Sequence, residues 1–413
     1  MDSTTFFANL AAPGFDQLFV TLKALLVSAF PEVIQPLVSI VLSISAIIAV
    51  FGLLFAITTV VERKGLGRIQ NRPGPNRVGL PWFHVGPLSH LNGFGQWLAD
   101  GIKTLIKEDI VPRSADKVIH FLAPLSLVVP VLLAFSVLPF GRNMTPIELD
   151  AGLLFFFAVG AGTELSVFMA GWSSRNKYSL LGAMRALAQM LSYEIPLILS
   201  ALTAVMLVGT LSLNDIVVAQ EAKPGQWLAN WHVFTPWGFA GFILFLIAAT
   251  AESNRSPFDI PEGESEIIAG YYIEYSGFKF AIFFLGEYFG LFAMSGLAIT
   301  LFLGGWTAPI AFLSFIPSWM WFFGKLFALI ALFIWLRGTL PRVRMDQLMN
   351  FAWKFMLPLA LINLVNVAVW HYTGGGMVSW VVCTLIIGIP YLLLGRTLFA
   401  GQKLGPRTYR YAS

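Results

Sequence analysis

The chain has 413 residues, of which 57% are hydrophobic, 15% are aromatic and only 12% are charged. Its mean hydropathy is +0.75, whereas an average soluble domain is about 25% charged. This composition excludes a soluble globular enzyme, and the aromatic content excludes a disordered chain. The apolar runs are continuous and about twenty residues long, so they predict membrane-spanning helices and not the alternating strands of a β-barrel.

Cysteine and histidine usage argues against a redox centre on this chain. Cys383 is the one cysteine, and the five histidines form no i, i+4 pair. An intrachain disulfide, an iron–sulfur cluster and a C-x-x-C-H haem site are therefore excluded, and we expect no metal site. The net charge of +4 fits Lys and Arg on the cytoplasmic side of a membrane better than binding to nucleic acid.

Nine apolar segments are predicted to cross the membrane. Residues 6–30 are also apolar but contain proline, glycine and charged residues, so we interpret them as an interfacial segment. Three glycines at 374–376 predict a tight turn between the last two spans. The predicted spans are 36–60, 118–138, 151–171, 184–209, 236–252, 280–304, 318–336, 354–373 and 377–395.

The distribution of positive charge predicts the orientation. Of the 26 Lys and Arg residues, 21 fall on one side of these spans and three on the other. The N-terminus is therefore expected outside and the C-terminus in the cytoplasm. The connections 61–117 and 253–279 are long and lie on the cytoplasmic side, where we expect the functional end of a single membrane domain.

The first long connection combines positive charge with a defined backbone. Five basic residues lie between Arg63 and Arg77, and Pro73-Gly74-Pro75 demands a turn. One interpretation is an anchor for anionic lipid; the fixed backbone favours a built site instead. Residues 93–108 predict an amphipathic helix, which would lie in the interface plane or form one wall of a side entrance for a lipid-soluble ligand.

The segment 252–287 holds seven of the 22 acidic residues. Pro257 and Pro261 break the helix there, and irregular backbone at membrane depth requires burial or a wet cavity. A solvated acidic loop is the alternative, but aromatic residues alternate with the acids and favour a packed segment.

Six ionisable residues lie within or at the ends of predicted spans, where each costs about 2.5–3.5 kcal/mol. Arg185 and Glu194 are nine residues apart, point to opposite faces of one helix and cannot pair with each other. Structural ion pairs with other helices are one interpretation, and a buried proton or ion relay is the other. The six are Glu164, Arg185, Glu194, Glu252, Glu287 and Lys325.

These motifs together resemble a known family. The chain is similar to the H subunit of proton-pumping NADH–quinone oxidoreductase, respiratory complex I, which is also called the mitochondrial subunit 1 family. The resemblance is carried by five segments on the cytoplasmic side: 62–79, 98–112, 172–196, 251–288 and 335–358.

The resemblance implies roles for individual residues. Quinone would be the substrate, and flavin mononucleotide and iron–sulfur clusters would lie on partner subunits. The partners would be soluble quinone-site subunits and membrane-arm subunits in a bacterial inner membrane. The residues expected around the quinone chamber are Glu62, Arg63, Arg72, Asp100, Arg255, Asp259, Glu262, Glu264 and Glu266. Those expected along the proton path are Arg185, Glu194, Glu252, Glu274, Glu287 and Lys325.

The chain also departs from the family pattern. Residues 80–92 are longer than the usual link, the ninth segment exceeds the common eight helices, and Glu164 receives no role from the resemblance. A homologous membrane subunit of an energy-converting hydrogenase is the nearest alternative. A stand-alone ion transporter is a further alternative, but it predicts inverted repeats, which the sequence does not show.

Overall fold

The structure, a computed structural model, describes residues 15–78, 93–222, 229–260 and 270–400. These residues form helices joined by turns and contain no strand. Eight of their helices are long and apolar enough to cross a membrane. The prediction of an all-α polytopic membrane protein is therefore confirmed. The long link predicted at residues 80–92 lies outside the described residues.

Each predicted apolar segment coincides with a helix, but the segment predicted at 236–252 forms a helix of only 17 residues (Pro236–Glu252), which is not among the eight. The long helices are α3 (Gln35–Ile69), α5 (Lys117–Ala134), α6 (Gly152–Ser173), α7 (Lys177–Val208), α10 (Gly277–Phe302), α11 (Ser318–Thr339) and α14 (Met377–Ala400). A further long helix comprises α12 (Met345–Phe351), a π-helical turn (Ala352–Met356) and α13 (Leu357–Thr373). The shorter helices are α2 (Leu18–Ser28), α4 (Gln96–Ile106), α8 (Leu213–Ala219) and α9 (Pro236–Glu252).

Two helices are longer than hydropathy predicts. α3 continues beyond the predicted end at residue 60 to Ile69, and α7 begins at Lys177 instead of residue 184. A span predicted from hydropathy ends at the first charged residues. The helix itself can continue through charged residues whose side chains have partners. Glu62 therefore lies inside α3 and not in a loop, and only 5% of its surface is exposed.

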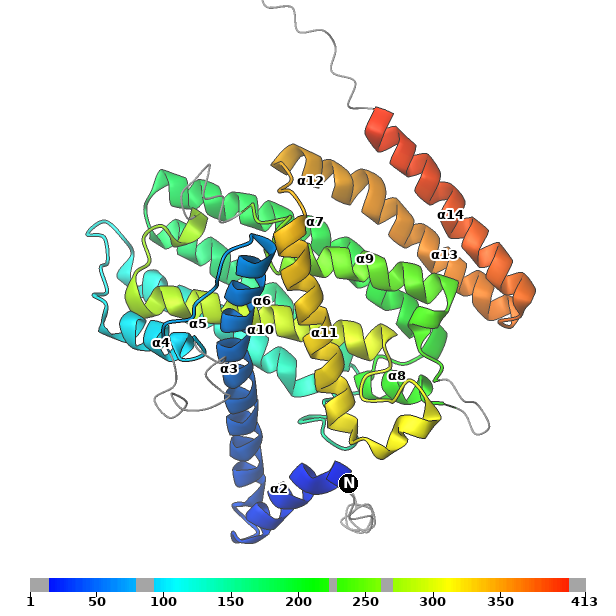
Figure 1. The fold of residues 1–413 in the computed structure, drawn as a ribbon, viewed down its shortest axis with the longest axis horizontal. Helices are drawn as coiled ribbons and strands as arrows, with labels where there is room; N and C mark the ends of the chain where they lie inside the picture. The colour runs from blue at the N-terminus through cyan, green and yellow to red at the C-terminus, as the bar shows by residue number, and fades with distance from the viewer. Residues whose placement is uncertain (1–14, 79–92, 223–228, 261–269, 401–413) are drawn as a thin grey trace, which may run out of the picture.

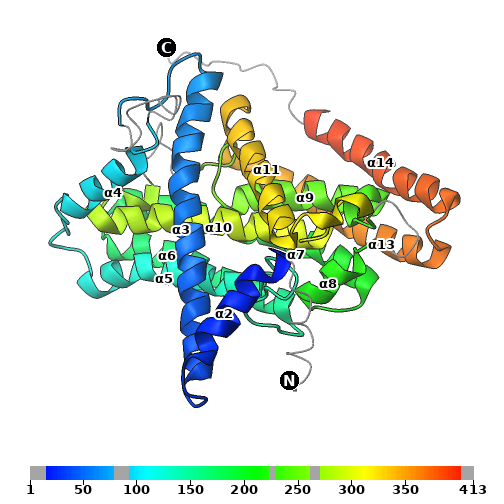
Figure 2. The same cartoon turned by 60° about the horizontal axis from the view of Figure 1, so that its bottom comes forward.

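Helices far apart in sequence form one bundle. α5 packs against α6 and α10, while α7 packs against α6, α9 and α13. α3 lies at one side, and its N-terminal half extends past the bundle with α2 beside it (Figures 1 and 2). α14 packs on α13 at the right-hand edge of the bundle in Figure 1.

Local sequence signals explain several helix ends. Asp116, Asn176 and Thr235 accept hydrogen bonds from main-chain N–H groups in the first turns of α5, α7 and α9. Glycines end helices where a left-handed residue is needed: α7 is followed by Gly209 at φ +81°, and α13 by Gly374 at φ +73°. The glycine run 374–376 thus makes the turn into α14.

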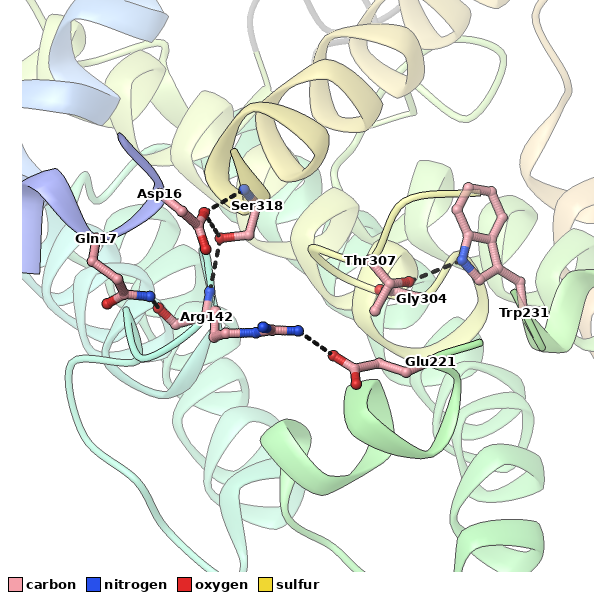
Figure 3. Close-up of polar contacts among 8 residues, drawn as sticks. All are labelled: Asp16, Gln17, Arg142, Glu221, Trp231, Gly304, Thr307 and Ser318. Atoms are coloured by element: carbon pink, nitrogen blue, oxygen red, sulfur yellow. Dashed lines mark hydrogen bonds and ion pairs between the residues drawn. The ribbon is translucent and has the colours of Figure 1, made fainter. Parts of the chain in front are cut away.

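The N-terminal segment is joined to α11 on the face drawn in Figure 3. The Asp16 carboxylate accepts hydrogen bonds from Ser318 N at 2.5 Å and Ser318 Oγ at 2.6 Å. Ser318 Oγ also accepts from Arg142 N at 3.0 Å. Because α11 begins after Pro317, which makes no side-chain cap, Asp16 supplies its capping acceptor and a negative charge beside its N-terminus.

We predict that Asp16→Ala lowers the thermal unfolding midpoint of the detergent-solubilised protein. Loss of a capping acceptor costs roughly 0.5–2 kcal/mol. Glu32→Ala is the matched control, because Glu32 is an exposed acid between α2 and α3. Equal midpoints for the two variants would show that Asp16 does not stabilise α11.

Candidate functional site

A buried carboxylate brings four segments together. Glu62 of α3 accepts a hydrogen bond from Tyr288 Oη of α10 at 2.6 Å. Its other oxygen lies 3.4 Å from Arg255 Nη1, in the segment after α9, and forms an ion pair with Arg337 of α11. The Arg255 guanidinium also lies 4.0 Å from the centre of the Tyr288 ring. We call these four residues the Glu62 cluster.

The charges in the Glu62 cluster are buried but compensated. Glu62 is 5% exposed and Arg255 is 8% exposed. Burial opposes the charge on Arg255, but the oxygens of Tyr288 and Glu62 raise its pKa above the ordinary value. Among the described residues, Arg255 Nε and Nη2 make no hydrogen bond. The cluster therefore keeps N–H donors that could bind the oxygen atoms of a ligand.

A second group of acids includes two that line a cavity between α5, α6, α7, α9 and α10. The cavity has a volume of about 70 Å³, and its lining includes Glu252, Glu287, Thr163 and Tyr271. Such a volume accommodates several water molecules. The Glu287 carboxylate accepts hydrogen bonds from the hydroxyls of Tyr271, at 3.3 Å, and Tyr272.

Two further acids belong to this group. Glu164 of α6 and Glu194 of α7 lie close enough to Glu252 for their negative charges to repel its charge. Within the described part of the chain, Glu164 Oε1 and Glu252 Oε2 have no hydrogen-bond partner. A cluster of acids that cannot all carry charge at low cost is suited to holding and exchanging protons. We call Glu164, Glu194, Glu252 and Glu287 the acidic group.

The basic connection and α4 lie beside α3. Arg63 forms an ion pair with Asp100 of α4, and Gln96 donates to the same carboxylate at 2.8 Å. The Lys64 ammonium lies 5.2 Å from the centre of the Phe94 ring. α4 leaves apolar side chains exposed, among them Ile106 at 79%. It is thus an amphipathic helix, as its sequence predicts.

The structure brings together some predicted site residues and separates others. Glu62 and Arg255 form an ion pair in one cluster. Glu252 and Glu287 line the same cavity, and Glu194 lies close enough to Glu252 for their negative charges to repel each other. Glu274 accepts a hydrogen bond from Asn176 at 2.7 Å, and Arg72 is exposed and donates to Gln70 at 2.7 Å. Asp259 and Arg185 are half-buried. Glu262, Glu264 and Glu266 lie outside the described residues.

Lys325 lies apart from both clusters. Its ammonium donates to main-chain carbonyls that follow the C-terminal end of α10. Glu287 lies sixteen residues earlier than Leu303 in the chain, which corresponds to about 24 Å along a helix. The predicted proton-path residues therefore do not form one contiguous group.

Sequence reasoning does not find two members of these clusters. It counts Arg337 only as a cytoplasmic positive charge and gives Tyr288 no role. It does find Glu164 as an ionisable residue inside a span, although the family resemblance assigns Glu164 no role. Arg337 and Tyr288 carry no such signal, because only the packing of α10 and α11 on α3 brings them to Glu62.

We predict that Glu62→Gln destabilises the protein far more than Asp100→Asn. The first change leaves two guanidinium groups without their carboxylate, which typically costs about 3–5 kcal/mol for a buried pair. The second removes a partly exposed pair, typically about 0–1 kcal/mol. The measurement is the thermal unfolding midpoint of each purified variant. Similar losses in both variants would contradict a central role for the Glu62 cluster.

Comparison with known proteins identifies the family. Residues 42–368 match the family model described as NADH dehydrogenase. The chain is 50% identical to the H subunit of NADH-quinone oxidoreductase from Dehalococcoides mccartyi over 308 residues, 75% of this chain and 80% of the relative. It is 46% identical to the H subunit from Bacillus cytotoxicus over 321 residues, 77% and 90% of the two chains. The chain therefore belongs to the NADH dehydrogenase family, the family of the H-type membrane subunit of NADH–quinone oxidoreductase.

Proposed function

We propose that this chain forms the membrane side of a quinone-binding chamber and couples quinone reduction to proton translocation. Its relatives are named for NADH–quinone oxidoreductase. The Glu62 cluster would face the quinone headgroup, and the acidic group would hold the protons. The enzyme activity would belong to the whole complex and not to this chain alone.

The chamber is proposed from the donors and walls around the Glu62 cluster. Arg255 has N–H groups that could donate to a quinone carbonyl oxygen or to the negative oxygen of its reduced form. The exposed apolar face of α4 would admit a lipid-soluble substrate from the bilayer. Arg63, Arg72, Asp100 and Asp259, together with Glu262, Glu264 and Glu266, remain proposed members of this chamber.

One observation carries the coupling proposal. Glu287 and Tyr288 are consecutive residues of α10; Glu287 lines the acidic cavity, and Tyr288 binds Glu62. Glu252, the last residue of α9, lines the same cavity, and Arg255, three residues later, pairs with Glu62. A change of charge beside the Glu62 cluster therefore occurs close to the acids that would hold protons.

Electrostatics alone is strong enough for this coupling. Reduction of a quinone to a quinol takes two electrons and two protons, so each electron adds negative charge until a proton arrives. Unit charges about 10 Å apart interact by about 1.7 kcal/mol at an effective dielectric constant near 20. That energy changes the proton affinity of a carboxylate more than tenfold. Reduction would thus draw protons onto the acidic group, and proton uptake by the quinone would release them.

The remaining parts of the pathway are proposed from the family. Electrons would arrive from partner subunits that carry flavin mononucleotide and iron–sulfur clusters. Glu274 and Arg185 would connect the acidic group to the cytoplasm and to neighbouring membrane subunits. The N-terminus would lie in the periplasm and the C-terminus in the cytoplasm of a bacterial cell.

We predict that Glu252→Gln and Glu266→Gln each lower quinone reduction or the proton yield per electron pair, while the complex still assembles. In Glu252→Gln, loss of one titratable charge would change the proton affinity of the other acids in the acidic group by roughly tenfold. Glu266 lies outside the described residues, and the expectation for its variant rests on the role that the family resemblance implies. NADH-driven quinone reduction and proton uptake in vesicles measure the two quantities.

Glu221→Gln is the matched control for this experiment. Glu221 is a partly exposed acid that pairs with Arg142 at 3.2 Å on the face opposite the cytoplasmic connections. The control variant should keep both quantities at the level of the unaltered protein. Unaltered turnover and unaltered proton yield in both Glu252→Gln and Glu266→Gln would contradict the coupling proposal.

A further inference from the structure

The turn after α10 presents main-chain carbonyls to one cation. The Lys325 ammonium donates to the carbonyl oxygens of Leu303, Gly305 and Thr307 at 2.7, 2.8 and 2.8 Å. Gly304 and Gly305 have φ values of +70° and +53°. These left-handed conformations turn alternate carbonyls towards the same point, which side chains at both positions would disfavour.

The indole ring of Trp231 closes the same space. The Lys325 ammonium lies 4.1 Å from the ring centre. Trp231 Nε1 donates to Thr307 Oγ1 at 3.0 Å, so the ring is tied to the turn that it covers (Figure 3). A Cβ atom at Gly304 would lie 2.3 Å from Trp231 Nε1. The turn and the ring therefore form one tightly packed unit.

A buried glutamine forms hydrogen bonds with the main chain of this turn and of the segments beside it. Gln220 is fully buried, and its Oε1 accepts from Gly304 N at 3.1 Å and from His232 N at 3.3 Å. Its Nε2 donates to Thr300 O at 2.9 Å. Gln220 thus joins the turn at Gly304 to the last turn of α10 and to His232, while the three carbonyls remain available to Lys325.

The hydrogen bonding identifies the charge state of the lysine. An ammonium has three donors and three carbonyls receive them, whereas a neutral amine would oppose its lone pair to a carbonyl oxygen. Burial lowers the pKa of the neighbouring His232 to about 4, so that ring is neutral. Within the described residues, no carboxylate forms an ion pair with Lys325. The positive charge is therefore balanced by carbonyl dipoles, by the C-terminal end of α10 and by the ring face.

We propose that residues 303–307 and Trp231 form a binding site for a monovalent cation of ammonium or potassium size, and that the tethered ammonium of Lys325 occupies it permanently. Convergent main-chain carbonyls are the groups that replace the hydration shell of such ions. The occupied site joins the end of α10 to α11. Lys325 is then a positioning residue and not a carrier in the proton path. This inference goes beyond the proposed function and does not depend on it.

The test asks whether an added cation replaces the missing side chain. In the assembled complex, Lys325→Ala leaves the carbonyls and the ring but removes the ammonium. A reporter cysteine replaces Ala229, which is 3% exposed and donates from its main chain to Pro309 O at 3.1 Å. The background carries Cys383→Ser, because Cys383 is the one native cysteine. The rate of maleimide labelling at position 229 then reports opening of the turn, whatever the activity of the complex.

In a choline buffer, we expect Lys325→Ala to raise the labelling rate about tenfold or more, because choline is too large for the site and the turn opens locally. Potassium or methylammonium at equal ionic strength should slow the labelling again. Lys325→Met should label rapidly in every buffer, since its neutral side chain fills the space. Protection of Lys325→Ala by either small cation supports the site. Protection by neither cation, or slow labelling in choline, overturns it.

A second pair of variants keeps the proposal testable if Lys325→Ala does not assemble. Trp231→Leu removes the ring face but keeps the lysine, whereas Trp231→Phe keeps a ring and loses only the N–H group. Faster labelling in Trp231→Leu than in Trp231→Phe supports the cation site. Equal labelling in the two variants overturns the role of the ring in binding the cation.

Discussion

The burial of Glu62 is the constraint on which the arrangement of this protein depends. A carboxylate removed from water costs several kcal/mol unless its partners are held in place. Its partners come from α10, from α11 and from the segment after α9, so α3 cannot move independently of them. The position of α3 in turn places Arg63 beside Asp100 of α4. One buried charge thus determines how α3, α10, α11 and the segment after α9 meet.

α10 and α11 are joined at two places. Tyr288, near the middle of α10, and Arg337, in the last turn of α11, meet at Glu62. The turn after α10 accepts hydrogen bonds from Lys325 of α11. A helix pair held in this way keeps a constant separation between charges along its length. Electrostatic coupling between the Glu62 cluster and the acidic group would therefore require no large movement of α10, since the distances are already short.

Irregular backbone in the membrane is tolerated where buried side chains form hydrogen bonds with its free N–H and C=O groups. Gln189 of α7 donates to Ala251 O and to Phe258 O, both at 2.7 Å, across the break that follows α9. In the turn after α10, Gln220 accepts a hydrogen bond from Gly304 N, and Lys325 donates one to Thr307 O. The two breaks have different consequences. The break after α9 places Glu252 in the acidic group and Arg255 in the Glu62 cluster. The turn after α10 binds the ammonium of Lys325.

Sequence alone determined the helical membrane class, the segments that became helices and the acids placed within them. These properties follow from local quantities, namely hydropathy over about twenty residues and the cost of a charge inside a span. It did not determine that Glu62 lies within α3, because hydropathy does not report the partners that allow a helix to continue through charges. Nor did it place Arg337 and Tyr288 at Glu62 or separate Lys325 from the acids. Those relations depend on which helix faces pack together, and only the tertiary structure decides that, because the contacting residues are separated by hundreds of positions in the chain.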